Sequence, residues 1–138
     1  MRQRMLLIGS GGREHTLAWK LTQSSKLEKL YVVPGNGGIG RLAERVLILA
    51  TDMEGLLRFA QEKKIDFTIV GPDEPLALGI VDRFQSAGMK IFGPSRLAAE
   101  IEASKAFSKQ FMEKYGIPTA SFGVFRDFEE ASRYLEKV

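Results

Sequence analysis

A glycine-rich turn near the start of the chain has the composition of an anion-binding loop. In the stretch MLLIGSGGREH, the apolar run 5–8 ends at Gly-Ser-Gly-Gly, and a helical pattern begins a few residues later. Backbone N–H groups at such a turn and at the following helix N-terminus point toward a bound phosphate. Arg13 adds a cation that opposes the helix dipole, but its guanidinium fork matches a phosphate. We therefore expect Gly11, Gly12 and Arg13 to hold a phosphate; the alternative is that Arg13 is an ordinary solvated arginine.

The same turn departs from the two best-known nucleotide-binding loops. A dinucleotide-binding turn has three glycines in the pattern G-x-G-x-x-G and an acidic residue about 20 positions later. Gly9 and Gly11 fill the first two positions, but Glu14 occupies the third, and the second apolar run ends in Val-Val-Pro at 32–34. The P-loop pattern also fails, because no Gly-Lys-Ser/Thr follows the turn. A hydride-transferring enzyme is therefore disfavoured.

Few other side chains in this region indicate chemistry of their own. Glu14 is explained by the preference of acidic residues for helix N-termini. His15 is the only histidine, and a single histidine does not make a metal site, so we expect it to cap or pack rather than to transfer a proton. With no cysteine and no evident Ser-His-Asp set, we expect neither a catalytic nucleophile nor a metal site in this chain.

Apolar runs alternate with helical patterns over the first 95 residues. We expect strands at 5–8, 30–33, 46–49, 67–70 and 91–92. Helices are expected at 14–23, from an N-cap at Thr51 to Lys64, and from after Pro75 to Ala87. This alternation with short links predicts an α/β fold, a Rossmann-like open parallel sheet with helices on both faces.

Three glycine-rich clusters each follow an expected strand, at 9–12, 34–38 and 71–75. In open parallel sheets, ligands bind outside the carboxyl ends of the strands. The three clusters therefore predict a shared pocket at one edge of the sheet. The competing interpretation is that glycine and proline serve here only as turn residues.

The pattern changes after Ser95. A long helix is expected at 96–115, with a break near Ser104, followed by a strand at 120–125 and an amphipathic helix from Asp127. We expect two domains: an N-terminal substrate-binding α/β domain at 1–100, and a linker helix with the truncated beginning of a second domain at 101–138. Because the chain ends inside a helical pattern, we expect it to be a fragment.

Composition narrows the class of protein. The 138 residues are 44% hydrophobic and carry a net charge of +3, with basic and acidic residues mixed along the chain. No apolar run approaches the roughly 20 residues that span a bilayer, and the N-terminal run is too short for a signal peptide. We expect a cytoplasmic protein that binds neither membranes nor nucleic acid, since a basic stripe with interleaved aromatics is lacking. The mild positive balance suits small anionic substrates.

Several segments in combination resemble the phosphoribosylamine–glycine ligase family, the glycinamide ribonucleotide synthetases. In chain order they are IGSGGREHTLAWKL, VVPGNGGIG, IVGPDEPLALGIVDRF, IFGPS and SKAFSKQFMEKYGIPTA. The resemblance implies the N-terminal domain and the start of the ATP-grasp domain of a purine-biosynthesis ligase. Such an enzyme joins glycine to 5-phosphoribosylamine through a glycyl phosphate and forms glycinamide ribonucleotide, ADP and phosphate. Family chains are about three times longer, so this chain alone is expected to be inactive.

The resemblance also implies roles for particular residues. The expected substrate-binding residues are Gly11, Gly12, Arg13, Glu14, Asn36, Gly37, Gly38, Pro72 and Asp73. Asp73 stands where the family usually has glutamate; the charge is the same, but the side chain is one methylene shorter and reaches less far toward ribose hydroxyls. Lys105 resembles the lysine that begins the ATP site, the alternative being a solvated helix lysine. ATP with Mg or Mn would be bound mainly by residues beyond Val138, and none tightly by this chain.

Two other functions stay open at this point. One is the N-terminal domain of another ATP-grasp carboxylate–amine ligase or purine carboxylase, and the other is a non-enzymatic nucleotide-binding module. The PGNGG and SKAFSK segments favour the glycine ligase. The expected partners are 5-phosphoribosylamine, glycine and ATP, and apolar residues after Ser104 also predict some self-association of the chain.

Overall fold

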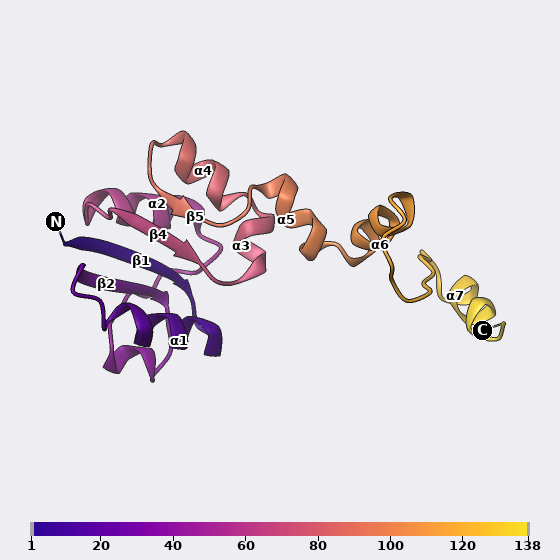
Figure 1. The fold of residues 1–138 in the computed structure, drawn as a ribbon, viewed down its shortest axis with the longest axis horizontal. Helices are drawn as coiled ribbons and strands as arrows, with labels where there is room; N and C mark the ends of the chain where they lie inside the picture. Colours follow the sequence, from indigo (N-terminus) through magenta and orange to yellow (C-terminus); the bar gives the residue numbers. More distant parts are fainter. Residues whose placement is uncertain (1, 138) are drawn as a thin grey trace. The chain divides into compact units, whose positions relative to one another are not determined.

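The structure is a computed structural model that describes residues 2–137, shown in Figure 1. Its elements are β1 (Gln3–Gly9), α1 (Gly12–Leu21), β2 (Leu27–Pro34), the 3-10 helix η1 (Ile39–Arg41), β3 (Glu44–Arg45), α2 (Met53–Glu62), β4 (Phe67–Val70), α3 (Asp73–Ala77), α4 (Ile80–Ser86), β5 (Ile91–Phe92), α5 (Arg96–Ala103), α6 (Lys105–Lys114) and α7 (Phe128–Leu135). The chain divides into two units between Ala99 and Glu100. None of the helices in the described part has the length and apolar character needed to cross a bilayer.

The first unit is built on a five-stranded sheet with the strand order β3-β2-β1-β4-β5 and parallel pairing throughout. The central strand is β1, and Ile8 is in register with both Val33 of β2 and Val70 of β4. The turns after β1, β2 and β4 therefore leave the same edge of the sheet side by side. This confirms the predicted parallel sheet and the common edge predicted for the three glycine-rich clusters.

Helices cover both faces because the central strand is apolar on both sides. Leu6 and Ile8 belong to the larger core, which includes residues of α2, α3 and α4, whereas Leu7 belongs to a smaller core with residues of α1 and η1. Figure 1 shows α1 on one side of the sheet and α2 and α4 on the other. All three side chains are fully buried, and burial of each contributes about 1.5–3 kcal/mol. These contacts fix the strand from which the glycine-rich turn emerges.

The strand predicted at 46–49 was wrong by about two positions. β3 covers Glu44–Arg45, and the segment 46–49 is not a strand. The Val46 N–H still donates to the Val32 carbonyl at 3.0 Å, but the next ladder bond would need an N–H from Pro34, which proline lacks. The pairing of β3 with β2 therefore ends at Arg45, just before the apolar run 46–49 that suggested a strand.

Two helix predictions also need correction. The N-cap of α2 is Asp52, whose carboxylate accepts from the Gly55 N–H at 2.9 Å, and not Thr51. Both residue types are strong caps, so the sequence pattern alone did not distinguish them. The single helix expected up to Ala87 is two short helices, α3 and α4, because Gly79 between them adopts a left-handed conformation with φ 91°.

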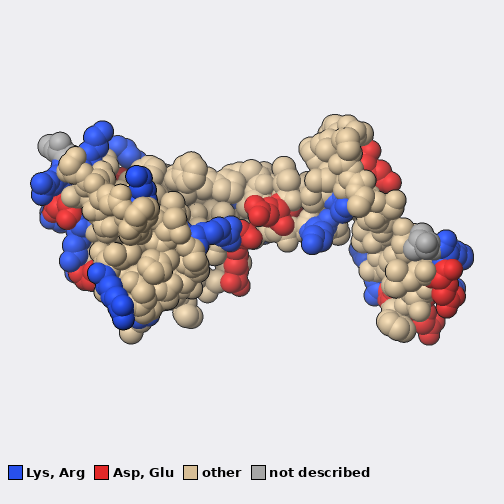
Figure 2. All heavy atoms as spheres, turned by 60° about the horizontal axis from the view of Figure 1, so that its bottom comes forward, with Lys and Arg blue, Asp and Glu red and all other residues tan. Residues whose placement is uncertain are grey.

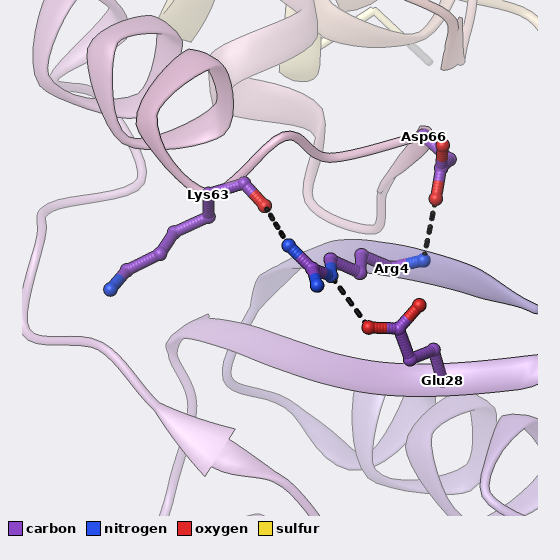
Figure 3. A network of polar contacts seen from close by, with 4 residues as sticks. All are labelled: Arg4, Glu28, Lys63 and Asp66. Atoms are coloured by element: carbon purple, nitrogen blue, oxygen red, sulfur yellow. Dashed lines mark hydrogen bonds and ion pairs between the residues drawn. The ribbon is translucent and has the colours of Figure 1, made fainter.

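The amino ends of the strands are tied together by a polar network on Arg4, shown in Figure 3. The Arg4 backbone N–H donates to the Asp66 carboxylate, and its Nε donates to Glu28 Oε1, both at 2.8 Å. The Glu28 carboxylate, through this hydrogen bond and its charge, raises the pKa of the Arg4 guanidinium. Because the network lies at the edge opposite the glycine-rich turns, it supports the sheet without entering the candidate site.

The second unit is held together by local contacts. A break at Ser104 separates α5 from α6, as predicted, and the Ser104 hydroxyl caps α6 by accepting from the Phe107 N–H at 3.3 Å. The Lys109 Nζ donates to Thr119 Oγ1 at 2.6 Å, which fastens the following segment to α6. No strand forms at 120–125, which corrects the prediction, because no other strand in residues 100–137 offers a pairing partner. None of the residues 100–137 is buried.

Candidate functional site

The three glycine-rich turns are joined by backbone hydrogen bonds at the carboxyl edge of the sheet. The Gly35 N–H donates to the Gly9 carbonyl at 3.2 Å, and the Gly71 N–H donates to the Ile8 carbonyl at 3.0 Å. Gly9 has φ 132°, a conformation that residues with a side chain rarely adopt. These bonds hold the turn after β1 between the turns after β2 and β4.

Asn36 connects two of the turns through its side chain. Its Nδ2 donates to the Ser10 carbonyl at 2.7 Å, and its Oδ1 accepts from the Ile39 N–H at 2.9 Å. Both polar ends of the amide are therefore engaged in fixing the loop 34–38 against the loop 9–12. Asn36 thus lies at the edge of the sheet where the turns meet, and its side-chain hydrogen bonds fix the spacing of these two turns.

Glu14 is the residue whose position the sequence predicted least well. It lies in the first turn of α1, where acidic residues are common, but the residue is buried and only 3% exposed. Its Oε2 accepts from the Gly11 N–H at 2.6 Å, and its Oε1 is buried without a hydrogen-bond partner in the described residues. A Cβ on Gly9 would lie 2.7 Å from the Glu14 carboxyl carbon, and one on Gly71 would collide with Oε1. The carboxylate therefore fits only because both neighbours are glycine.

The start of α1 presents free donors to an incoming anion. Within α1 the first backbone N–H with a helical partner is that of His15, which donates to the Gly11 carbonyl at 3.0 Å. The N–H groups of Gly12 and Arg13 precede it, and both residues are exposed. Because the Gly11 N–H is bonded to Glu14 and Glu14 itself is buried, Gly12 and Arg13 carry the exposed donors of this helix terminus.

The remaining predicted residues lie around the same edge. Gly37 is exposed, and Gly38 lies against His15, since a Cβ on Gly38 would be 3.1 Å from His15 Nδ1. The half-buried His15 therefore packs on the second turn, which agrees with the packing role expected for it. Pro72 is the N-cap of α3, and Asp73 is the first, exposed residue of that helix.

Charges on the molecular surface are mixed. On the face drawn in Figure 2, lysine and arginine side chains are interspersed with acidic ones and separated by broad uncharged areas. Within residues 2–137 no group of three or more His, Asp or Glu side chains is placed to hold a metal ion. Lys105, in the second unit, is the exposed first residue of α6.

Comparison with protein-family models decides the family. The model described as "Phosphoribosylglycinamide synthetase, N domain" matches residues 3–102. The chain belongs to the phosphoribosylglycinamide synthetase family. The ATP-grasp (A) domain model of phosphoribosylglycinamide synthetase matches residues 103–138, so the start of an ATP-grasp domain follows the parallel-sheet domain.

Relatives of this synthetase chain agree with that assignment. It is 55% identical over 132 residues to phosphoribosylamine–glycine ligase of Halalkalibacterium halodurans, covering 96% of this chain and 31% of the relative. It is 50% identical over 137 residues to the ligase of Allochromatium vinosum, covering 98% and 32%. The chain thus spans about a third of the length of these curated relatives.

Solved structures share the synthetase fold. The crystal structure of phosphoribosylamine–glycine ligase from Thermotoga maritima matches with a TM-score of 0.73 and 30% identity, over 97% of this chain and 30% of that one. N5-carboxyaminoimidazole ribonucleotide synthetase from Thermus thermophilus matches with a TM-score of 0.67 and 21% identity, over 97% and 36% of the two chains. The second likeness shows the fold alone.

Proposed function

We propose that the chain is the N-terminal third of an ATP-dependent ligase that joins glycine to 5-phosphoribosylamine in de novo purine biosynthesis. The observation that carries this proposal is the 50–55% identity to phosphoribosylamine–glycine ligases over nearly the whole chain. ATP phosphorylates the glycine carboxylate, and the ribosylamine nitrogen attacks the resulting acyl phosphate. The products are glycinamide ribonucleotide, ADP and inorganic phosphate.

In this proposal, residues 1–100 bind the ribosylamine at the carboxyl edge of the sheet. The N–H groups of Gly12 and Arg13 and the Arg13 guanidinium hold the 5-phosphate, which suits a dianion at a helix N-terminus. Gly11 shapes the turn, and the loop 36–38 lines the same edge. Pro72 and Asp73 approach the ribose, where the Asp73 carboxylate accepts hydrogen bonds from hydroxyl groups. The free donors of α1 and their position beside two other glycine-rich turns support this assignment.

Residues 101–138 supply the linker helix and the beginning of the ATP-grasp domain. Lys105 is the candidate for a contact with ATP from this part of the chain. No group of three or more His, Asp or Glu side chains in residues 2–137 is placed to hold a metal ion. As the family resemblance implies, we assign the metal-bound triphosphate mainly to residues beyond Val138. An acyl-phosphate route depends on positioning and charge neutralisation more than on a nucleophilic side chain, so no residue of this chain is assigned a catalytic role.

A ligand titration tests the proposal on the 138-residue chain. Ribose 5-phosphate, AMP and NAD are added separately to 15N-labelled protein, and backbone amide shifts are recorded. Ribose 5-phosphate should bind and shift the amides of Gly12, Arg13 and the loop 34–38. A selective response to NAD would contradict the ligase assignment and favour a nucleotide-binding module, and a selective response to AMP would place a nucleotide at this edge instead of the ribosylamine.

A further inference from the structure

The buried Glu14 carboxylate occupies the point where parallel sheets of this kind receive ligands. The chain runs outward from β1 to β2 and β3 and then returns to the other side of β1 with β4. The crevice at this reversal of strand order is the usual ligand site in open α/β sheets. Glu14 lies in that crevice, with Gly9 and Gly11 of the β1 turn on one side and Gly71 of the β4 turn on the other.

The glycines here make room for a side chain of the protein itself. In a dinucleotide-binding turn, glycines let the pyrophosphate approach the backbone, and the third glycine lets helix and strand pack closely. In this chain, Cβ atoms on Gly9 and Gly71 would meet the Glu14 carboxyl group, and one on Gly11 would lie 2.9 Å from its Oε2. The space that would otherwise accept a diphosphate is therefore filled.

Glu14 also removes a donor and adds a charge. The Gly11 N–H, which would face a pyrophosphate, donates instead to Glu14 Oε2 at 2.6 Å. The second oxygen, Oε1, is buried and has no partner in the described residues. A carboxylate in this crevice repels a second anionic group, so the donors left to a phosphate are those of the exposed Gly12 and Arg13 at the outer rim.

We propose that Glu14 is a specificity-determining residue that closes the crevice between β1 and β4 to diphosphates and confines the site to one terminal phosphate at Gly12 and Arg13. It acts through its volume, its charge and its bond to Gly11, which replaces the direct substrate contact that the family resemblance implied for Glu14. The inference rests on the proposed function in one respect, namely that this edge binds a sugar phosphate. It goes beyond it by stating why dinucleotides and nucleoside diphosphates are rejected.

The test compares ribose 5-phosphate with ADP-ribose, which carries the same sugar phosphate extended to a diphosphate. Both are titrated calorimetrically into the 138-residue chain and its Glu14→Ala and Glu14→Gln variants, with folding checked by thermal melting. Wild type should prefer ribose 5-phosphate by at least roughly tenfold, or about 1.4 kcal/mol. Glu14→Ala should gain roughly tenfold or more in affinity for ADP-ribose. Glu14→Gln, which keeps the volume and an acceptor for Gly11 but loses the charge, should gain clearly less affinity for ADP-ribose than Glu14→Ala and should still prefer ribose 5-phosphate.

Several results would overturn the inference. One is equal affinity of wild type for the two ligands, and another is a folded Glu14→Ala variant with no gain for ADP-ribose. A Glu14→Gln variant that gains as much as Glu14→Ala would also contradict it. If Glu14→Ala does not fold, wild-type amide shifts decide the question, because ribose 5-phosphate should move Gly12 and Arg13 and leave Gly11 nearly unchanged.

These arms separate failure of the inference from failure of the proposed function. If wild type shows no binding of ribose 5-phosphate, the proposed ligand is wrong. Even then, a higher affinity of Glu14→Ala than of wild type for ADP-ribose would support the closure of the crevice by Glu14. A preference for ADP-ribose in wild type would contradict the inference while leaving a phosphate site at this edge.

Discussion

At the scale of single residues, the fit of Glu14 between glycine backbones makes a prediction about stability. Gly71→Ala places a Cβ against Glu14 Oε1 and should expel the carboxylate from its bond to Gly11. Loss of a hydrogen bond to a charged group costs about 1.5–3 kcal/mol. Gly12→Ala is the matched control, because a Cβ there meets no atom within 4 Å, and alanine is favoured over glycine in a helix by roughly 0.5–1 kcal/mol.

A double-mutant cycle isolates the contact. In the Glu14→Ala background, Gly71→Ala should cost little, because the atom it collides with is gone. Chemical denaturation of the four proteins should give a coupling free energy within the range of about 0.5–3 kcal/mol seen for contacting residues. Additive effects of the two substitutions would show that Gly71 is glycine for some other reason.

At the scale of helices and strands, a pair of exposed side chains links α2 to α4. The Arg83 Nε donates to Glu54 Oε1 at 2.6 Å, and its Nη2 donates to Oε2 at 3.0 Å. These hydrogen bonds lower the pKa of the Glu54 carboxyl. Because the folded-state pKa lies below the unfolded value of about 4.3, the pair stabilises the fold above that pH, and its contribution is lost as the pH falls through the folded-state pKa.

Melting temperatures check this expectation. Wild type should exceed Glu54→Gln slightly at pH 7, since exposed pairs contribute little, and the difference should shrink below pH 4. High salt at pH 7 should reduce it as well. A difference that is independent of pH would mean that Glu54 stabilises the helices by packing and not by charge.

Elements were predictable from the sequence where a local pattern determines them. β1, β2 and β4 follow from apolar runs, and the sheet edge at which their turns meet follows from the alternation of strands and helices. The misplacement of β3 arises from Pro34 on the neighbouring strand, which is a pairing effect invisible in the segment 46–49. Burial of Glu14 was missed because it depends on Gly71, 57 positions further along the chain. The sequence does hold one signal of this burial, namely a glutamate at the third glycine position of the G-x-G-x-x-G pattern. That glutamate indicated only that the chain lacks a dinucleotide site, and not that its side chain fills the crevice.

At the scale of the whole molecule, the second unit should be the least stable part. None of its residues from 100 to 137 is buried, and Phe128 and Leu135 are 84% and 71% exposed. Hydrogen exchange in α6 and α7 should therefore be much faster than in β1, and the apolar surface should promote self-association that grows with concentration. Protection of α6 equal to that of β1, in a sample shown to be monomeric by sedimentation, would contradict this.

The 138-residue chain should also form no glycinamide ribonucleotide. Catalysis requires both reactants and the metal-bound triphosphate to be held together, and we assign the triphosphate site to residues beyond Val138. The assay supplies the purified chain with phosphoribosylamine, glycine, ATP and Mg. ATP-dependent product in excess of a no-enzyme control would refute the prediction.

Arg13→Ala in a full-length ligase that carries this chain as its N-terminal third tests whether the turn 9–13 holds the substrate phosphate or ATP. Lys20→Ala, at the other end of α1, is the control. With folding confirmed by melting, steady-state kinetics should show a KM for phosphoribosylamine raised roughly ten- to a hundredfold, as expected for loss of about 1.5–3 kcal/mol, with the KM for ATP nearly unchanged. A raised KM for ATP with an unchanged KM for phosphoribosylamine would show that the turn binds the nucleotide.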